Sequence, residues 1–324
     1  MNKTWLIIKR EYITRVRNKT FIISTFLTPL FFVGLIAAII YMTPKDRTTL
    51  DPGIADVIEK SKEGDNAKSG IAYAVGYTSS FLIYITILIY GTMVMRGVSE
   101  EKTNRIAEII ISSVKPFQLM MGKIIGIGAV GLTQFFIWII LVIIFALVLF
   151  NFLPQDVLNE AGPQSAQHES AGLGASMAGV NLPLIILCFL FYFIFGYLFY
   201  ASLFAAVGSA VSEDSQDTQS LMLPVTMPIV LAIVIMMQVI VHPSAPMATW
   251  TSMVPFFSPV VMMARIPFGV PSAVPWYELA LSMLLLIAGF LFTTWLSAKI
   301  YRTGILLYGK KITWKEMWRW TVRS

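Results

Sequence analysis

Long apolar runs with almost no charge decide most of what this chain can fold into. The first, residues 20–42, has 23 residues without Asp, Glu, Lys or Arg, and about 20 such residues cross the hydrocarbon core of a bilayer. Runs with at most one charge follow at about 71–95, 117–150, 182–211, 220–241 and 278–298. Lipid offers the backbone no hydrogen-bond partners, so each run has to form a helix. The sequence therefore predicts an all-α, polytopic membrane protein with six transmembrane helices.

The composition agrees with this prediction. Hydrophobic residues make up 56% of the chain and charged residues only 13%, against about 25% charged residues in soluble domains. The mean hydropathy is +0.73. The single cysteine, Cys188, lies inside an apolar run and cannot form an internal disulfide, so its expected role is core packing.

The positions of the basic residues predict the orientation in the membrane. Three segments, 1–19, 96–123 and 299–324, hold 18 of the 24 lysines and arginines. The positive-inside rule places such segments in the cytoplasm. We therefore expect a multi-pass protein of the cell (inner) membrane with both termini in the cytoplasm.

The same pattern divides the chain into segments. Residues 1–19 and 299–324 combine basic residues with an apolar stripe at helical spacing, which predicts amphipathic helices on an anionic lipid surface. The transmembrane domain between them, 20–298, contains an outer loop at 43–70. It also contains a segment at 243–275 with seven prolines, which excludes one straight span and predicts short re-entrant or surface helices on the outer side.

The most distinctive charged segment, 98–114, lies between the second and third spans. Ser99 is its expected N-cap, and Lys115-Pro116 ends it. Glu101, Arg105 and Glu108 share one face, and Ile106, Ile109 and Ile110 form an apolar stripe. This stiff amphipathic helix either transmits force from a cytoplasmic partner or only connects two spans, and the pattern alone leaves both open.

A family resemblance favours the first of these readings. The run Met95-Arg-Gly-Val98, the run Glu100-Glu-Lys-Thr-Asn-Arg105, Glu108 and the run Ser113-Val-Lys-Pro116 resemble the cytoplasmic coupling segment of type-2 ABC exporter permeases, with sodium- and drug-export permeases the nearest subgroup. The resemblance implies an elbow helix at 1–19, a separate ABC ATPase subunit, a second permease copy and outward transport. The substrate stays open among ions, drugs, peptides and lipids. The residues expected to contact the ATPase are Glu100, Glu101, Lys102, Arg105 and Glu108.

Polar residues elsewhere predict three further features. Glu213, Asp214 and Asp217 form an acidic cytoplasmic turn, expected to be a second contact with the ATPase. Uncharged polar residues inside spans usually face the bundle interior, so they either line a conduit or bond between helices: Gln134, Thr226 and Gln238. Gly122 and Gly126 have the small-xxx-small spacing that allows two helices to approach closely.

Motifs for chemistry are weak or incomplete. No phosphate-binding Gly-x-x-x-x-Gly-Lys-Ser/Thr occurs, so ATP and Mg²⁺ are expected on the partner subunit, and we expect this chain to be a transport subunit, without a cofactor, a metal or a nucleic-acid partner. Glu100-Glu-x-x-x-Arg105 also matches a signature of CAAX-type intramembrane proteases. That chemistry needs histidines in membrane helices, whereas His168 and His242 fall in predicted outer loops. The other alternative is a secondary carrier coupled to protons or sodium ions. The sequence offers it little support, because no acidic residue is predicted in the middle of a span.

Overall fold

The computed structural model describes residues 3–19, 21–27, 29–30, 34, 64–104, 113–152, 181–211, 215–307 and 316–317. The chain divides into two compact units. The first contains Met1–Ile13, Tyr73–Gly131 and Pro183–Ser324, and the second contains Thr14–Ala72 and Leu132–Leu182.

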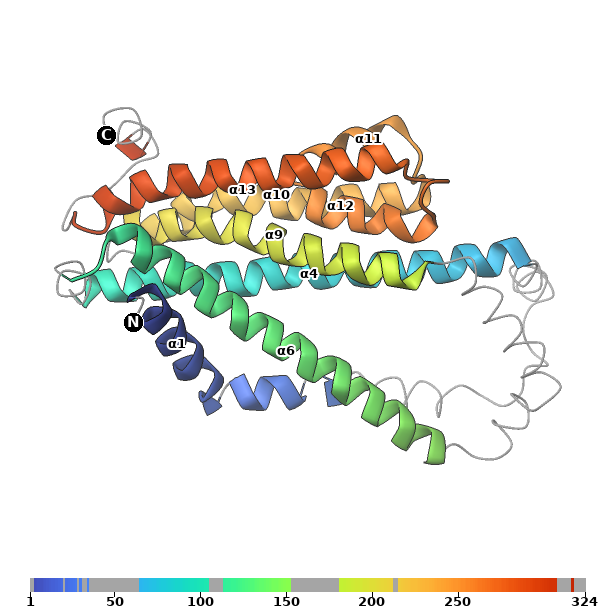
Figure 1. Cartoon of the computed structure of the whole chain (residues 1–324), viewed down its shortest axis with the longest axis horizontal. Helices are drawn as coiled ribbons and strands as arrows, with labels where there is room; N and C mark the ends of the chain where they lie inside the picture. Colours follow the sequence, from blue (N-terminus) through green and yellow to red (C-terminus); the bar gives the residue numbers. More distant parts are fainter. Residues whose placement is uncertain are drawn as a thin grey trace. The chain divides into compact units, whose positions relative to one another are not determined.

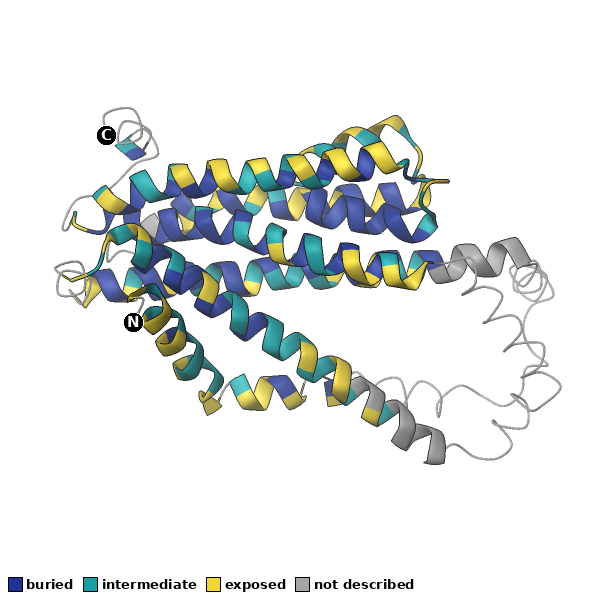
Figure 2. Cartoon of the chain, in the orientation of Figure 1, coloured by how far each residue is buried: buried dark blue, intermediate teal, exposed yellow. Residues whose placement is uncertain are grey.

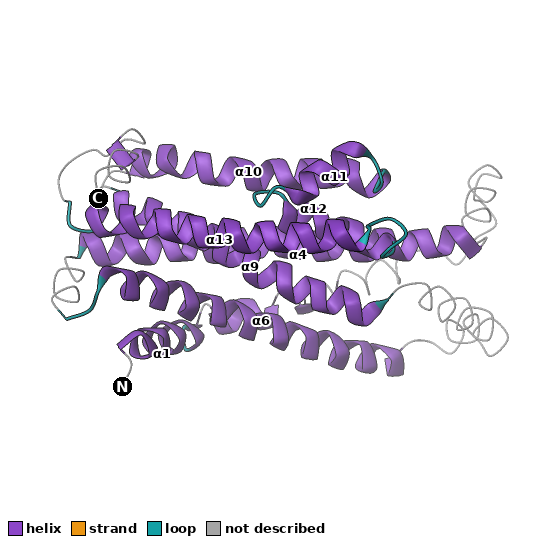
Figure 3. Cartoon of the chain, turned by 45° about the horizontal axis from the view of Figure 1, so that its top comes forward, coloured by secondary structure: helices purple, strands orange, loops and turns teal. Residues whose placement is uncertain are grey.

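Five helices of the described chain are long and apolar enough to cross a membrane. They are α4 (Gly64–Thr103), α6 (Pro116–Phe152), α9 (Leu182–Ala210), α10 (Ser215–Val241) and α13 (Trp276–Gly304). The described residues form only helices, turns and loops (Figure 3), which confirms an all-α polytopic membrane protein. The predicted first span, 20–42, lies mostly outside the described residues, and those of its positions that are described are helical.

The first unit contains a short helix, α12 (Ser258–Arg265), whose eight residues are all buried. Helix α9 is buried along much of its length, and Figure 2 shows further buried positions on α4 and on the first turns of α6. In contrast, α10 and α13 carry exposed apolar side chains, among them Leu231, Met237, Leu284 and Phe292. Exposed apolar surface of this kind is expected to be covered by lipid tails or by another protein surface.

Close contacts at glycines fix how the helices of this unit run. A Cβ atom on Gly76, near the start of α4, would lie 2.7 Å from the carbonyl oxygen of Ala264 in α12. A Cβ atom on Gly304, at the end of α13, would lie 2.8 Å from the Ser209 hydroxyl at the end of α9. Gly208 of α9 similarly abuts the backbone of Met95 in α4. At Gly76, α4 therefore lies against α12, and its last turns meet the ends of α9 and α13 (Figure 1).

The proline-rich segment forms short helices, as its sequence predicts: α11 (Pro246–Met253), α12 and the 3₁₀ helix η2 (Ile266–Phe268). Arg265 joins them, although it is 1% exposed. Its Nε donates to the Pro243 carbonyl at 2.8 Å, and one terminal nitrogen donates to the Ser252 hydroxyl at 2.6 Å. The other forms an ion pair with Glu278 of α13 at 2.9 Å. One guanidinium thus ties the end of α10 to α11, α12 and α13.

Some predicted boundaries are wrong. Helix α4 begins at Gly64, so the last seven residues of the predicted loop 43–70 are helical. Helix α10 is continuous through Pro224 and Pro228. Helix α13 continues to Gly304, past the predicted end of the span at 298.

The described part of the second unit includes the helical residues 21–27 and the later half of α6. The Trp138 indole of α6 donates a hydrogen bond to the carbonyl of Thr25 at 3.0 Å. This bond connects α6 to the segment predicted as the first span.

Candidate functional site

The candidate site begins where helix α1 (Lys3–Val16) packs against the first turns of α6. A Cβ atom on Gly122 would lie 2.8 Å from the Ile7 side chain, and one on Gly126 would lie 2.8 Å from the Cβ of Glu11. The close helix approach that the Gly122–Gly126 spacing predicts is therefore present. Its partner is the N-terminal basic helix, which the spacing alone could not identify.

This close packing buries three charged side chains together, which we call the Glu11–Lys123–Glu101 cluster. The Lys123 ammonium on α6 lies 3.0 Å from Glu101 of α4 and 3.4 Å from Glu11 of α1. It also donates a hydrogen bond to the carbonyl of Gly97 at 3.0 Å. Lys123 is 1% exposed, and both glutamates are buried. One ammonium thus connects α1, α4 and α6 over sequence separations of 112 residues and 26 residues.

Two further lysines extend these connections. The buried Lys102 donates to the carbonyl of Ser209 at 2.7 Å, where its positive charge also suits the C-terminal end of α9. Lys3 of α1 donates to the carbonyl of Ser113 at 2.7 Å, just before α6. The two ends of the segment between α4 and α6 are therefore both bonded to other helices of the unit.

The Glu11–Lys123–Glu101 cluster connects three helices but is expected to add little to the free energy of unfolding. Transferring charges out of water costs about as much as their mutual attraction returns, so a buried ion pair is weak evidence for stability. Its bonds are directional, however, and breaking one leaves an uncompensated buried charge. Among the residues that the structure describes, one carboxylate oxygen of Glu101, Oε2, and the hydroxyl of Tyr301 are buried without a hydrogen-bond partner. The arrangement therefore holds α1, α4 and α6 in one register and resists their separation.

The predicted coupling residues fall in two places. Glu100, Glu101 and Lys102 belong to the last turns of α4, which continues to Thr103, so the predicted N-cap at Ser99 and the start of a separate helix at 98 are wrong. The local sequence allowed a start there, but the buried bonds of Glu101 and Lys102 hold the helix together beyond that point. Glu100 is exposed. Arg105 and Glu108 lie outside the described residues, and contact with an ATPase stays a prediction for all five.

The other predicted sites are only partly described. Glu213 and Asp214 lie outside the described residues, and Asp217 lies in the first turn of α10.

The predicted conduit residues are likewise not gathered by any described contact. The Thr226 hydroxyl bonds to carbonyls of its own helix, those of Met222 and Leu223. Gln238 is exposed on the same helix, whereas Gln134 belongs to the second unit. A conduit lined by these residues stays a prediction.

Sequence reasoning missed the roles of Glu11, Arg265 and Glu278. Glu11 is the one acid among six basic residues in 1–19, and Arg265 is the one Asp, Glu, Lys or Arg between residues 218 and 277. A lone charge of this kind inside a basic or apolar segment is the signal that could have identified them, because such a charge is paired when it is buried.

The arrangement does not suit the protease alternative. Glu101 of the Glu-Glu-x-x-x-Arg motif is bound by Lys123 at the end of α4. His242 follows the last residue of α10 and is exposed. That end of α10 adjoins α11 and α12, whereas α4 ends at the opposite end of the bundle (Figure 1). His242 is therefore remote from Glu100 and Glu101, with which it would have to form a protease active site.

Comparison with known proteins adds the family. Residues 54–299 match the model of the ABC-2 family transporter protein. The chain is 32% identical over 258 residues, 79% of its length, to the uncharacterized protein YhaP of Bacillus subtilis, and 29% identical over 268 residues, 83% of its length, to the uncharacterized protein MJ1024 of Methanocaldococcus jannaschii. These matches cover 57% and 59% of the two relatives, so the chain spans less than two thirds of their length. No solved structure matches the chain. The five apolar membrane helices and a match over most of the sequence agree, and the chain belongs to the ABC-2 transporter family.

Proposed function

We propose that this chain is the membrane permease of an ATP-driven ABC exporter and that it moves its substrate outward. In this proposal a separate ABC ATPase subunit binds ATP and Mg²⁺, and two permease copies complete the transporter. The observation that carries the proposal is the Glu11–Lys123–Glu101 cluster. It lies beside the end of α4, where the segment that resembles a coupling helix begins. A force applied to residues 104–114 would reach α4, α6 and α1 together through these bonds.

We propose different roles for the predicted contact residues. Glu100 is exposed and available to a partner, as we propose for Arg105 and Glu108 also. Glu101 and Lys102 are bonded inside the chain, so we propose that they hold the base of the coupling segment rigid. Glu213, Asp214 and Asp217 would supply the second contact on the same side of the membrane.

Co-expression with an ABC ATPase subunit encoded beside the chain tests the assignment. We expect the two proteins to copurify, and we expect a panel of ions, drugs, peptides and lipids to contain a compound that stimulates ATP hydrolysis. The permease purified alone should bind no ATP. Nucleotide binding by the isolated chain would overturn the assignment.

Substitution of the exposed contact residues tests the coupling role. Glu100→Ala with Arg105→Ala should leave insertion normal and weaken ATPase association at least tenfold, because an interfacial charge that loses its partner costs about 2 to 5 kcal/mol. Lys9→Ala, at an exposed position of α1 outside the contact set, is the control. Unchanged association and transport in the double variant would refute this role.

Cysteine labelling tests the proposed orientation. In a Cys188→Ser background, a cysteine at position 60 or 165 should react with an impermeant maleimide added to intact cells. A cysteine at position 104 or 216 should react only after the cells are opened. Labelling of position 104 from outside would place the coupling segment on the wrong side.

A further inference from the structure

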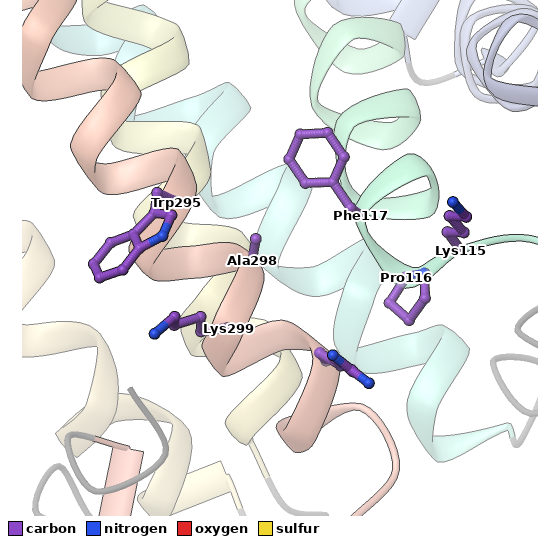
Figure 4. A pocket seen from close by; sticks show the side chains of 7 residues that line it. Lys115, Pro116, Phe117, Trp295, Ala298 and Lys299 are labelled. Atoms are coloured by element: carbon purple, nitrogen blue, oxygen red, sulfur yellow. The ribbon is translucent and has the colours of Figure 1, made fainter. Parts of the chain in front are cut away.

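A cleft of about 610 Å³ lies where α6 begins and α13 approaches its end. Its α6 side consists of Lys115, Pro116 and Phe117, and its α13 side includes Trp295, Ala298 and Lys299 (Figure 4). Arg302 completes the lining. All seven residues belong to the first unit, and none of them was singled out above as a contact of the ATPase.

The charge of this cleft is one-sided. Three of its residues are basic and none is acidic. Within the described chain, the Lys115 and Arg302 side chains have no ion-pair or hydrogen-bond partner. The Lys299 ammonium lies 4.5 Å from the centre of the Trp295 ring, over which it is held as a cation–π contact. The cleft also contains the first residue of α6, so the positive end of that helix dipole adds to the field.

The rest of the lining is apolar. The Phe117 ring projects from α6 toward α13 (Figure 4), and Phe117 and Trp295 are 50% and 52% exposed. An anion as small as phosphate would leave these rings uncovered. A ligand with an acyl chain beside its negative group would cover them, and the volume falls within the roughly 300–1,000 Å³ of ordinary ligand sites.

The place of the cleft along the helices matches such a ligand. Helix α6 begins at Pro116, and α13 passes Trp295 two to three turns before it ends at Gly304. Tryptophan above lysine and arginine at the end of a membrane helix is the arrangement typical of the lipid–water interface. Basic pockets between membrane helices on the cytoplasmic side bind phospholipid headgroups.

From these features we infer that the cleft between the start of α6 and the end of α13 is a specific site for an anionic phospholipid. The phosphate lies near Arg302 at the end of α13, with Lys115 and Lys299 on the two sides of the cleft, and the glycerol and upper acyl chain cover Phe117 and Trp295. Lys115 lies between the coupling segment and α6. A lipid bound to Lys115 and to α13 would therefore fix the end of the coupling segment relative to α13. Loss of anionic lipid would remove this contact and leave the bond from Lys3 to the Ser113 carbonyl at this end of the coupling segment.

Quenching of Trp295 fluorescence by brominated lipids tests the site in the full-length protein. The chain has eight tryptophans, so the Trp295 component is taken as the difference between the wild type and Trp295→Phe in the same nanodiscs. Phosphatidylglycerol brominated near the glycerol end of its chains is titrated against brominated phosphatidylcholine. We expect half-maximal quenching at a mole fraction of phosphatidylglycerol several times below that of phosphatidylcholine.

Charge-neutralising variants then identify the residues responsible. Lys299→Gln and Arg302→Gln should each lower the preference for phosphatidylglycerol about fivefold, the equivalent of about 1 kcal/mol per basic residue at an anionic surface. Arg96→Gln removes an exposed charge of α4 outside the cleft and should leave the preference unchanged. An unreactive Cys188 thiol, buried in the folded chain, shows that each variant is folded.

Three results would overturn the inference. Equal quenching by the two lipids would mean ordinary contact with bilayer lipid. Loss of the difference on adding inorganic phosphate would mean a site for a free anion. An unchanged lipid preference in Lys299→Gln and Arg302→Gln, together with lost ATPase copurification, would mean that these charges serve the partner protein. Failure of the ATPase to copurify with the wild type would leave the lipid result standing, because the titration needs only this chain.

Discussion

Replacing Lys123 with methionine should be among the most damaging single substitutions in the first unit. The methionine keeps much of the apolar stem and removes the ammonium that contacts Glu101 at 3.0 Å and Glu11 at 3.4 Å. Removing one partner of a buried ion pair costs about 3 to 5 kcal/mol. The two carboxylates would then face each other, and at about 6 Å and an effective dielectric constant of about 20 their repulsion alone amounts to roughly 3 kcal/mol. We expect a loss of about 3 to 5 kcal/mol in the free energy of unfolding.

The chain contains its own probe for this measurement. Cys188 is the single cysteine, lies in α9 and is 1% exposed, so a maleimide reacts with it only when the first unit opens. Protein in mixed micelles is titrated with a denaturing detergent and pulse-labelled at each step. Lys123→Met should move the labelling midpoint to a clearly lower detergent fraction. Lys9→Met, at an exposed position of α1, is the control and should change stability by no more than about 0.5 kcal/mol.

A compensating variant separates lost charge balance from lost packing. Glu11→Gln and Glu101→Gln added to Lys123→Met remove the uncompensated charges, and an uncharged set of similar volume is often as stable as the ion set. We expect the triple variant to recover at least half of the lost stability. A wild-type midpoint for Lys123→Met, or a triple variant no better than the single one, would refute the reasoning.

Substitutions at Gly126, Arg265 and Lys102 are tested with the same labelling assay. Gly126→Ala places a methyl group 2.8 Å from the Cβ of Glu11 and should cost about 1 to 3 kcal/mol, whereas the exposed control Lys9→Met should cost no more than about 0.5 kcal/mol. Arg265→Met should cost about 3 to 5 kcal/mol of stability. Arg265→Lys should cost less, because lysine keeps the charge near Glu278 but cannot make all the hydrogen bonds of the guanidinium. Equal losses in the two variants would mean that the charge of Arg265 contributes nothing beyond its hydrogen bonds. Lys102→Met leaves a carbonyl at the end of α9 without its charged donor and should cost about 1.5 to 3 kcal/mol, and a cost below about 0.5 kcal/mol would mean that water replaces the bond.

The membrane helices could be read from the sequence because each depends on its own residues. Length and apolarity determine whether a segment crosses a bilayer, since the helix satisfies its backbone polar groups internally. The predicted run 182–211 corresponds to Leu182–Ala210, and 220–241 corresponds to the apolar part of Ser215–Val241. The proline-rich segment was equally local, because seven prolines in 243–275 forbid one long helix.

The charged residues could not be read in this way, because their partners are remote in the sequence. The sequence presented Glu101 as part of an exposed face and Lys123 as a residue extending into the cytoplasm. Tertiary packing brings Lys123 to Glu11, which precedes it by 112 residues, and buries both. The Gly122–Gly126 spacing predicted a close helix approach, but only the folded chain shows that α1 fills it. Local hydrophobicity thus determined which segments enter the membrane, whereas the pairing of buried charges was decided by which helices pack together, because a charge out of water is stable only beside a partner that the fold supplies.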